Sequence, residues 1–558
     1  MKKVFALSTA LLALWSTELT AATITVSSAS DAVANDGVCT LREAITAANS
    51  NTASGAAAGE CPAGTADDTI AFAIGSGAVT IAPTSTLPDI DDGITIDGTT
   101  QPGYAGMPIV ELNGTGAVAP GDWGLRVNDA VTILSLVINR FPGTGIIIGG
   151  STADAVVQGN FIGTDVSGTA DLGNGGHGIS LGGQNAVIGG PLQGQLNLIS
   201  GNAFCGIHVV GSQATGNRIE TNFIGTDISA TAALPNDLCG IVINNGANGN
   251  TVGLSLLQHN VISGNGGNGV EIGGGLAGTD DNEVLGNFIG TSGSGASALP
   301  NAGMGILVRD GAIDNHIGGE GGGEGNIIAF NGDRGIGFLE TAATGNRILS
   351  NLIHSNGGLG IDLSNDDVTA NDAGDVDVGP NGLQNFPILT LADDSSGSDV
   401  LLEGTFNGPA NSDFRLQFFV NDNCDPSGFG EGQALLGTAD VTTDGSGNAT
   451  FSQTFAVPFG GFFTATATNL VTGDTSEFSP CLAGSSAPAA TPTPTPTAIP
   501  TPSATPSASA SPTPTPDLGD NVALSGGGCS LGQAASSFGA WPMLLLLSLA
   551  LLRRRSAK

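Results

Sequence analysis

Short apolar segments bounded by Gly and Asn recur through the middle of the chain. The hexapeptide NFIGTD at 160–165 returns at 222–227 and, ending in Ser, at 287–292. A related hexapeptide, NLISGN at 197–202, returns as NVISGN at 260–265 and as NIIAFN at 326–331. Most intervals between them contain a Gly-Ile or Gly-Val strand start and a further short apolar strand. Three short strands in each turn of about 25 residues predict a parallel β-helix.

The repeats also predict which residues become neighbours. Coils of a β-helix stack about 4.8 Å apart, so equivalent asparagines such as Asn197 and Asn222 should form a hydrogen-bonded ladder. Every second coil carries extra residues after its first strand, and we expect these to bulge outward as a row of loops. Phe161, Phe223 and Phe288 hold strand positions and are expected to stack in the core. A leucine-rich-repeat solenoid is disfavoured because the required Leu spacing is absent.

The repeats should be covered at both ends. Thr40 and Glu43 form a capping box that predicts a helix to about Ala48, followed by the first coils at 69–74, 79–82 and 94–97. After 386 the pattern changes to strict alternation of apolar and polar residues, as in FRLQFFV at 414–420. Residues 386–484 are therefore predicted to form a small β-sandwich.

Two segments carry a resemblance to known proteins. The hexapeptide CTLREA at 39–44 is similar to the CSLREA motif of bacterial surface proteins, with Thr40 in place of Ser. The segment ITIDG at 94–98 and the repeats resemble right-handed parallel β-helix proteins of the pectate-lyase-like superfamily. This resemblance covers about residues 25–390. It implies an all-β chain with a helical cap and first coils at 23–100 and a right-handed parallel β-helix at 101–385.

The sequences of both chain ends are typical of targeting segments. Residues 1–22 combine Lys2 and Lys3, an apolar stretch and small residues, which predicts a signal peptide. Residues 485–524 are rich in Pro, Thr and Ser and should form an extended stalk. Residues 525–558 resemble bacterial C-terminal sorting signals of the Gly-Cys or Gly-Gly type, which implies display at the cell surface or outer membrane with Cys529 as a lipid-attachment point. An ordinary membrane tail anchor is the alternative. A monomer is expected.

The charge of the chain restricts its partners. Lys and Arg number 14 against 50 Asp and Glu, a net charge of −36, and residues 23–524 contain no Lys. Such a chain should not bind nucleic acid or an anionic membrane face through phosphate contacts.

Seven cysteines in an exported chain fit three disulfides and one remaining thiol. Cys205 and Cys239 each precede a Gly-Ile strand start in consecutive coils, so stacking of the coils brings them together. Cys39 with Cys61 would then hold the cap, and Cys424 with Cys481 the sandwich. Cys529 is left over. A zinc site is disfavoured because no CxxC motif or neighbouring His is present.

Candidate catalytic residues are few. The tripeptide Gly-His-Gly at 176–178 resembles the signature of polygalacturonase-type glycosidases, which also use paired carboxylates. The position of His177 holds Cys, Asn, Met, Arg or Leu in later coils, so a solvated corner residue is favoured over a catalytic one. Asp165 and Asp227 recur at a turn and are interpreted as corner residues. A lyase would need basic groups around an acidic sugar, and the negative charge of the chain disfavours that ligand.

The acidic segment 362–377 is the best candidate for a metal site. Its six carboxylates, spaced one to five positions apart, are typical of Ca²⁺ ligands, although the segment does not match the helix-flanked calcium loop. The predicted ligands are Asp362, Asp366, Asp367, Asp372, Asp375 and Asp377. A solvated acidic turn is the alternative.

Together these features predict an exported, surface-anchored β-helix protein with an adhesive or scaffolding role that binds a glycan or cell-surface ligand without catalysis. The alternative is a polysaccharide lyase or glycoside hydrolase on the same fold, since fold does not fix function.

Overall fold

The computed structural model describes residues 21–192, 194–256, 258–275, 278–339, 343–457 and 461–485. The predicted stalk and sorting signal, with Cys529, and nearly all of the predicted signal peptide lie outside these residues. Within them, no helix has the length and apolarity needed to cross a membrane.

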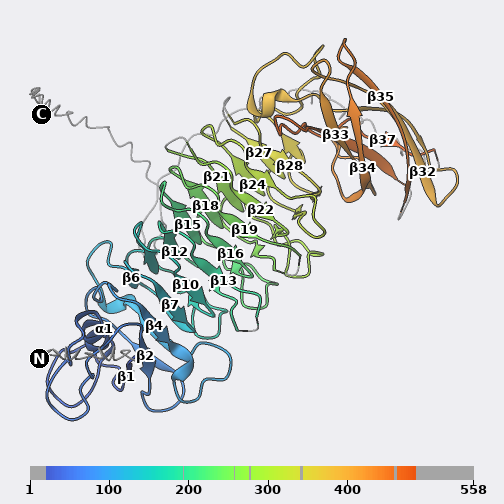
Figure 1. Ribbon diagram of the computed structural model, residues 1–558. Coiled ribbons are helices and arrows are strands. Elements are labelled where there is room, and N and C mark those ends of the chain that lie inside the picture. Colours follow the sequence, from blue (N-terminus) through green and yellow to red (C-terminus); the bar gives the residue numbers. More distant parts are fainter. Residues whose placement is uncertain are drawn as a thin grey trace, which may run out of the picture. The chain divides into compact units, whose positions relative to one another are not determined.

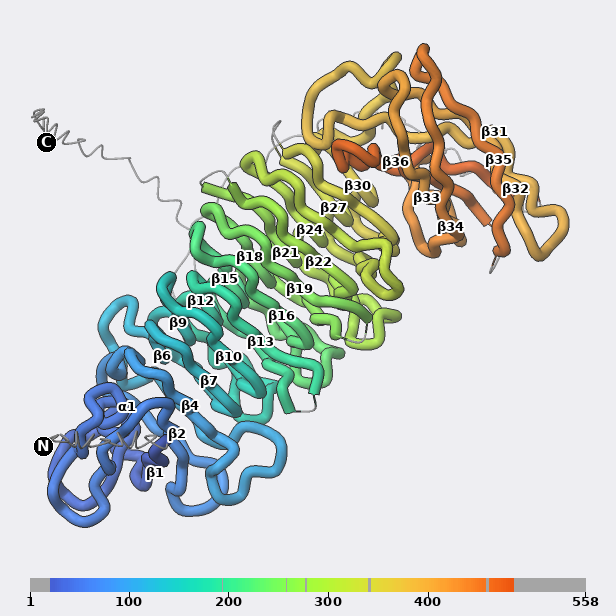
Figure 2. Tube along the Cα trace, in the orientation of Figure 1, coloured from blue at the N-terminus to red at the C-terminus, as the bar shows by residue number. Residues whose placement is uncertain are grey.

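A right-handed parallel β-helix with three long sheets makes up most of this part of the chain, as predicted (Figure 1). Figure 2 shows consecutive coils stacked one after another along the β-helix. Sheet A contains β1 (Thr23–Val26), β2 (Asp68–Phe72), β4 (Ile94–Asp97), β7 (Val131–Leu134), β10 (Val156–Gln158), β13 (Val187–Gly189), β16 (Arg218–Glu220), β19 (Thr251–Gly253), β22 (Glu283–Leu285), β25 (His316–Ile317) and β28 (Arg347–Ile348).

Sheet B contains β3 (Val79–Ile81), β5 (Val110–Asn113), β8 (Leu136–Asn139), β11 (Phe161–Ile162), β14 (Leu198–Ile199), β17 (Phe223–Ile224), β20 (Val261–Ile262), β23 (Phe288–Ile289), β26 (Ile327–Ala329) and β29 (Leu352–His354). Sheet C contains β6 (Leu125–Val127), β9 (Ile146–Ile148), β12 (Ile179–Leu181), β15 (Ile207–Val210), β18 (Ile241–Asn244), β21 (Val270–Ile272), β24 (Ile306–Val308), β27 (Ile336–Phe338) and β30 (Ile361–Asp362). Short 3₁₀ turns occupy Gly98–Thr100, Gly114–Gly116 and Pro380–Leu383.

Buried asparagines form ladders at the corners of the coils. Asn197 donates from Nδ2 to Asn222 Oδ1 at 2.9 Å, and Asn222 donates to Asn260 Oδ1 at 2.9 Å. Each also donates to a backbone carbonyl, as Asn222 does to Ile188 at 2.9 Å. The ladder between sheets A and B contains Asn160, Asn197, Asn222, Asn260, Asn287, Asn326 and Asn351. Equivalent ladders run through Asn174 and Asn202 between sheets B and C and through Asn217 and Asn250 between sheets C and A. The predicted ladder is therefore present and is repeated at all three corners.

The inserted residues of every second coil do not project as free loops. They fold back over the outer face of sheet B, where Phe161 and Leu198 form a hydrophobic cluster separate from the main core, with Phe223 and Ile228 packed against it. The loops also bond one another, since the N–H of Ile228 donates to Gly168 O at 3.0 Å. The expectation that Phe161 and Phe223 stack in the central core is thus wrong. The inner positions belong to the following isoleucines, such as Ile162 and Ile224.

The N-terminal end is closed by α1 (Leu41–Ser50), which begins at the predicted capping box. Thr40 Oγ1 accepts from the N–H of Glu43 at 3.3 Å, and Glu43 Oε2 accepts from the N–H of Thr40 at 3.0 Å. The Cys39–Cys61 disulfide is formed beside it. Sheet A starts earlier than predicted, because β1 pairs in parallel with β2.

Residues 388–483 form two antiparallel sheets that share a Phe-rich core. The first contains β31 (Ile388–Asp393), β32 (Asp399–Asn407) and β35 (Asn448–Ala456), and the second contains β33 (Asp413–Asn421), β34 (Ala434–Thr442), β36 (Phe462–Asn469) and β37 (Leu482–Ala483). Cys424 and Cys481 form a disulfide here. Phe419 and Phe478 belong to the hydrophobic core of the β-helix, so this sandwich covers its C-terminal end.

Candidate functional site

The outer face of sheet C carries a cleft of about 480 Å³. Side chains alternate between the two faces of a strand, and the central residues of β15, β18 and β21 point outward while their neighbours fill the core. Parallel register places His208, Val242 and Glu271 in one outward column, about 4.8 Å apart. The cleft is lined by His177, Phe204, Cys205, His208, Leu238, Val242, Asn244, Gly266, Gly267, Glu271 and Arg309.

Two histidines from consecutive coils form one end of the cleft. The ring of His177 lies 4.5 Å from the ring of His208 and 5.3 Å from that of Phe204, measured between centroids. Burial, and then the neighbouring His208, lower the pKa of His177 to about 4. Burial also lowers the pKa of His208, although a hydrogen bond of 3.0 Å between its Nε2 and Asn244 Oδ1 opposes the shift. Both rings are therefore neutral at pH 7.

A paired acid and base form the other end. Arg309 donates from a guanidinium nitrogen to Glu271 Oε2 at 3.1 Å, and Asn268 donates from Nδ2 to Glu271 Oε1 at 2.9 Å. Asp310 lies 3.9 Å from Arg309 Nε. Glu271 is the one carboxylate among the residues that line this cleft in the described chain.

An apolar rim borders the cleft. Phe204 is 47% exposed and Leu238 is 52% exposed, although both are large apolar side chains. They stand on consecutive coils, and the N–H of Leu238 donates to Phe204 O at 3.3 Å. Each precedes one half of the Cys205–Cys239 disulfide, whose Cα atoms are 4.4 Å apart. The predicted bridge therefore fixes the two corners that carry the rim.

The other candidate catalytic residues do not line this cleft. Asp165 Oδ1 accepts from the N–H groups of Thr169 and Ala170 at 3.0 Å each, and Oδ2 accepts from Ser167 Oγ at 2.7 Å. Burial raises the pKa of Asp165, but these hydrogen bonds outweigh it and lower the pKa overall. Asp227 makes the same contacts with Ser229, Thr231 and Ala232 in the next equivalent loop. Both carboxylates hold the turns that cover sheet B, so only His177 of the three lies in the cleft.

The six predicted calcium ligands divide into two groups. Asp362 is fully buried and accepts from Arg334 Nε at 2.7 Å, while Asp367 is exposed with an oxygen 3.8 Å from Arg334. The N–H of Asp366 donates to Asp362 Oδ1 at 3.3 Å. Arg334 comes from the preceding coil, which the sequence pattern did not connect with this segment.

The second group is a cluster of carboxylates. Asp372, Asp375 and Asp377 offer oxygens that lie within 4.8 Å of one another. Burial, with the charges of Asp377, Asp372 and Asp474, raises the pKa of Asp375 to about 7. Oδ1 of Asp377 is buried, and within the described part of the chain it has no hydrogen-bond partner. These oxygen donors could hold a hard cation.

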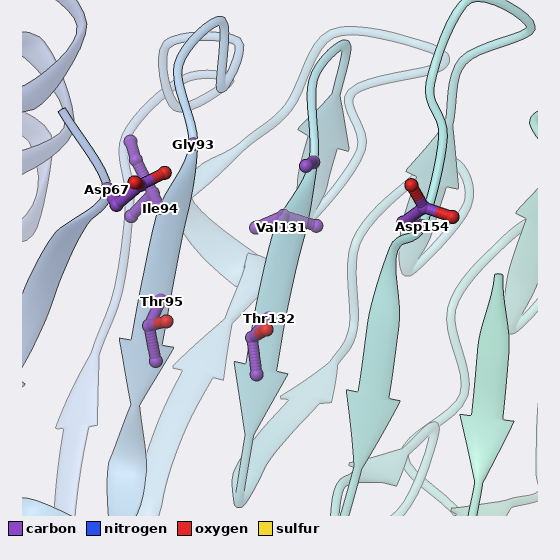
Figure 3. A pocket seen from close by; sticks show the side chains of 8 residues that line it. Asp67, Gly93, Ile94, Thr95, Val131, Thr132 and Asp154 are labelled. Atoms are coloured by element: carbon purple, nitrogen blue, oxygen red, sulfur yellow. The ribbon is translucent and has the colours of Figure 1, made fainter.

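A smaller hollow of about 160 Å³ lies on the outer face of sheet A (Figure 3). Asp67 and Asp154 stand on separate coils at its two sides, with Thr95 and Thr132 on the strands between them. Asp67 and Asp154 adopt left-handed backbone conformations, each with φ of 59°. Figure 3 shows that the two carboxylates do not converge on one point. The cleft on sheet C is therefore the stronger candidate site.

Comparison with known proteins gives little functional information. No family model matches the chain. No curated protein matches it either. Among solved structures, the enzymatically active domain of tailspike protein 2 of bacteriophage CBA120 is similar at 11% identity and a TM-score of 0.21, covering 75% of this chain and 71% of that one. Full-length tailspike protein 2 from an Escherichia coli O157:H7 bacteriophage is similar at 12% identity and a TM-score of 0.20, covering 75% of this chain and 62% of that one. At these values neither tailspike informs the function of this chain.

Sequence reasoning missed most of the cleft. Phe204, His208, Asn244, Glu271 and Arg309 were not identified from the repeats, because the positions that line the cleft change residue type from coil to coil. Alignment of whole coils, rather than of the Asn and Gly positions alone, would have placed His208 between Ser180 and Val242.

Proposed function

We propose that this chain is an exported, surface-anchored β-helix protein that binds a glycan through the cleft on sheet C and does not cleave it. In this role it would act as an adhesive or scaffolding protein. The observation that carries the proposal is the combination, in one cleft, of an exposed apolar rim with polar groups that are already oriented.

Sugar rings present apolar C–H faces and many hydroxyl groups, and the cleft offers partners for both. Phe204 and Leu238 provide an apolar surface against which a ring can pack. Asn244, Glu271 and Arg309 provide donors and acceptors in the same cleft. Because Arg309 and Asn268 already hold Glu271, and Asn244 and His208 are bonded to each other, these groups lose little freedom when a ligand binds.

The number of carboxylates among the described cleft residues favours glycan binding over hydrolysis. Glycoside hydrolases generally use two carboxyl groups on opposite sides of the bond that breaks. Here Glu271 stands alone among the described cleft residues, and its two oxygens are engaged by Arg309 and Asn268. His177 would have to act as a base, although its lowered pKa makes it a weak one.

A glycan panel tests this proposal. We expect immobilised glycans to retain the wild-type protein while no reducing ends or unsaturated sugars appear in solution. Leu238→Ala should weaken binding about tenfold or more, because it removes apolar contact at the rim. Leu192→Ala is the matched control, since Leu192 is an exposed leucine outside the cleft. Release of sugars by the wild-type protein, abolished in His177→Ala, would support the lyase or hydrolase alternative.

Surface anchoring is a separate part of the proposal. It is supported by the sequence of residues 525–558, which lie outside the described residues. If Cys529 is the attachment point, Cys529→Ser should move the protein from the cell envelope to the medium in a fractionation experiment. Retention of this variant in the envelope would favour an ordinary membrane tail.

We also propose that Asp372, Asp375 and Asp377 bind Ca²⁺. The proposal is supported by three carboxylates whose oxygens lie within 4.8 Å of one another. It is also supported by a buried oxygen of Asp377 that has no hydrogen-bond partner in the described chain. The site would tie residues 372–377 to the sandwich, because Gly374 N–H already donates to Asn407 Oδ1 at 2.7 Å.

A further inference from the structure

Arg309 is the one permanently charged cation that lines the cleft in the described residues, and its charge is already compensated by two carboxylates. Its guanidinium lies 3.1 Å from Glu271 Oε2 and 3.9 Å from Asp310 Oδ2. The two carboxylates more than balance its charge. Lysines are absent between 23 and 524, so no second cation of that kind can stand at the rim.

The remaining groups of the cleft add no positive charge. The rings of His177 and His208 face each other from consecutive coils, and protonation of either would be opposed by burial. Asp237 is exposed next to Leu238 and adds a negative charge at the rim. The whole chain carries −36, so a polyanion is repelled at long range as well.

We infer that the cleft selects neutral glycans and rejects uronate-containing glycans, and that the pairing of Glu271 with Arg309 sets this selectivity. The inference rests on the proposed glycan-binding function and names the ligand class of the same site. An uncharged sugar needs no free cation and can bond through its hydroxyls to Asn244, Glu271 and Arg309. A uronate would have to share Arg309 with Glu271 and Asp310, so that three negative charges would lie around one positive charge.

Glu271→Gln tests the pairing directly. Glutamine keeps an oxygen that can accept from Asn268 Nδ2, but it no longer carries the charge that neutralises Arg309. We therefore expect the variant to gain about tenfold or more in affinity for a uronate oligosaccharide at low salt, the size expected of one new charge-assisted hydrogen bond. Glu271→Gln/Asp310→Asn should gain further, because the second carboxylate near Arg309 is then neutral as well.

Glu320→Gln is the matched control. Glu320 pairs with Arg415 on β33, outside the cleft, so this variant reduces the net negative charge by the same amount without releasing Arg309. It should leave uronate affinity unchanged. The gain in Glu271→Gln should also shrink in about 0.5 M salt, because screening weakens a charge contact.

Wild-type binding gives a measurement that needs no variant. We expect a neutral oligosaccharide to bind with an affinity that is nearly independent of salt between about 0.05 and 0.5 M, and a uronate oligosaccharide of equal length to bind at least about tenfold more weakly. Equal affinity of the wild-type protein for the two oligosaccharides would overturn the inference and leave the glycan-binding function intact. Failure of both oligosaccharides, and of the wider glycan panel, would overturn the function and the inference together. Equal uronate affinity in Glu271→Gln and Glu320→Gln, both folded by circular dichroism, would also overturn the inference.

Discussion

The imidazole ring of His177 lies 4.5 Å from the ring of His208, although 30 residues and a full coil separate them in the chain. Ser180 pairs with His208 in the register of sheet C, and His177 stands at the corner that leads into the same strand. The stacking of consecutive coils therefore brings the two histidines together at one end of the cleft. Two adjacent rings in a half-buried site disfavour the protonated form.

Titration of His177 should reveal this pair. Followed by NMR, the ring should titrate with a pKa of about 4, below the ordinary 6.5. In His208→Asn the pKa of His177 should rise, because a protonated His208 ring no longer disfavours the charge on His177. The pKa of His177 should stay below 6.5, because burial is the larger cause. His354→Asn is the control and should leave the pKa of His177 unchanged, since His354 lies on β29 of sheet B, where it contacts Phe330. An ordinary pKa in the wild-type protein would contradict the packing described here.

The Cys205–Cys239 disulfide should stabilise the coils and shape the cleft. It closes a loop of 34 residues, for which chain entropy predicts about 3 to 4 kcal/mol. Cys205→Ser/Cys239→Ser should therefore lower the midpoint of thermal unfolding while preserving the β-sheet circular dichroism, because β15 and β18 stay paired through their backbone. Glycan binding should also weaken, since Phe204 and Leu238 lose their fixed corners. Cys424→Ser/Cys481→Ser, in the sandwich, should leave binding unaffected.

The repeats predicted the backbone well because their period is visible in the residues that the turns require. Asparagine recurs where its amide bonds the next coil, and this signal does not depend on neighbouring side chains. The same reasoning failed for Phe161 and Phe223. A strand of two residues, such as β11, places one side chain inward and one outward, and periodicity alone does not reveal which of two apolar residues is inside.

The functional residues were harder to predict because they are defined by differences between coils. His208, Val242 and Glu271 occupy one outward column but share no chemistry, so the repeat pattern hides them. The acidic segment shows the converse problem. Asp362 and Asp375 are close in sequence, yet Asp362 pairs with Arg334 from the preceding coil, while Asp375 clusters with other carboxylates.

Asn222→Ala tests the energetic role of the ladders. The amide of Asn222 donates to Ile188 O and Asn260 Oδ1 and accepts from Asn197 Nδ2, all at 2.9 Å. Its removal leaves several buried polar atoms without partners, and we expect a loss of about 2 to 4 kcal/mol in the free energy of unfolding. Asn248→Ala removes only a local bond to Gly246 O at a half-buried turn, so its cost should be about 1 kcal/mol or less. Equal effects in urea titrations would contradict the ladder model.

Calcium should raise the thermal stability of the chain if Asp372, Asp375 and Asp377 bind it. At about 100 times the dissociation constant the expected stabilisation is about 2.7 kcal/mol, and a chelator should reverse it. Asp375→Asn should abolish the calcium response and raise stability in chelator, because it removes the cost of burying this carboxylate and, to a smaller extent, its repulsion with Asp377 and Asp372. Asp367→Asn is the control, since the structure places Asp367 beside Arg334 rather than in this cluster. Loss of the response in Asp367→Asn would instead restore the six-residue site predicted from the sequence.

The junction between the β-helix and the sandwich should weaken as pH rises. Glu477 is 3% exposed and accepts from the N–H groups of Leu363 and Thr369 at 2.9 Å each, which ties the residues after β30 to the sandwich. Burial is the main cause that raises the pKa of Glu477 to about 8 from 4.5. Between these pH values Glu477 keeps a proton in the folded state and releases it in the unfolded state. The stabilising contribution of Glu477 is therefore complete below pH 4.5 and is lost as pH rises to about 8. Glu477→Gln cannot ionise and should flatten the pH dependence of the unfolding midpoint over this window. Glu403→Gln, on β32 with an exposed hydrogen bond to Ser452, should keep the wild-type dependence. A wild-type midpoint that rises between pH 5 and 8 would show that the hydrogen bonds from Leu363 and Thr369 outweigh burial and keep this carboxylate ionised.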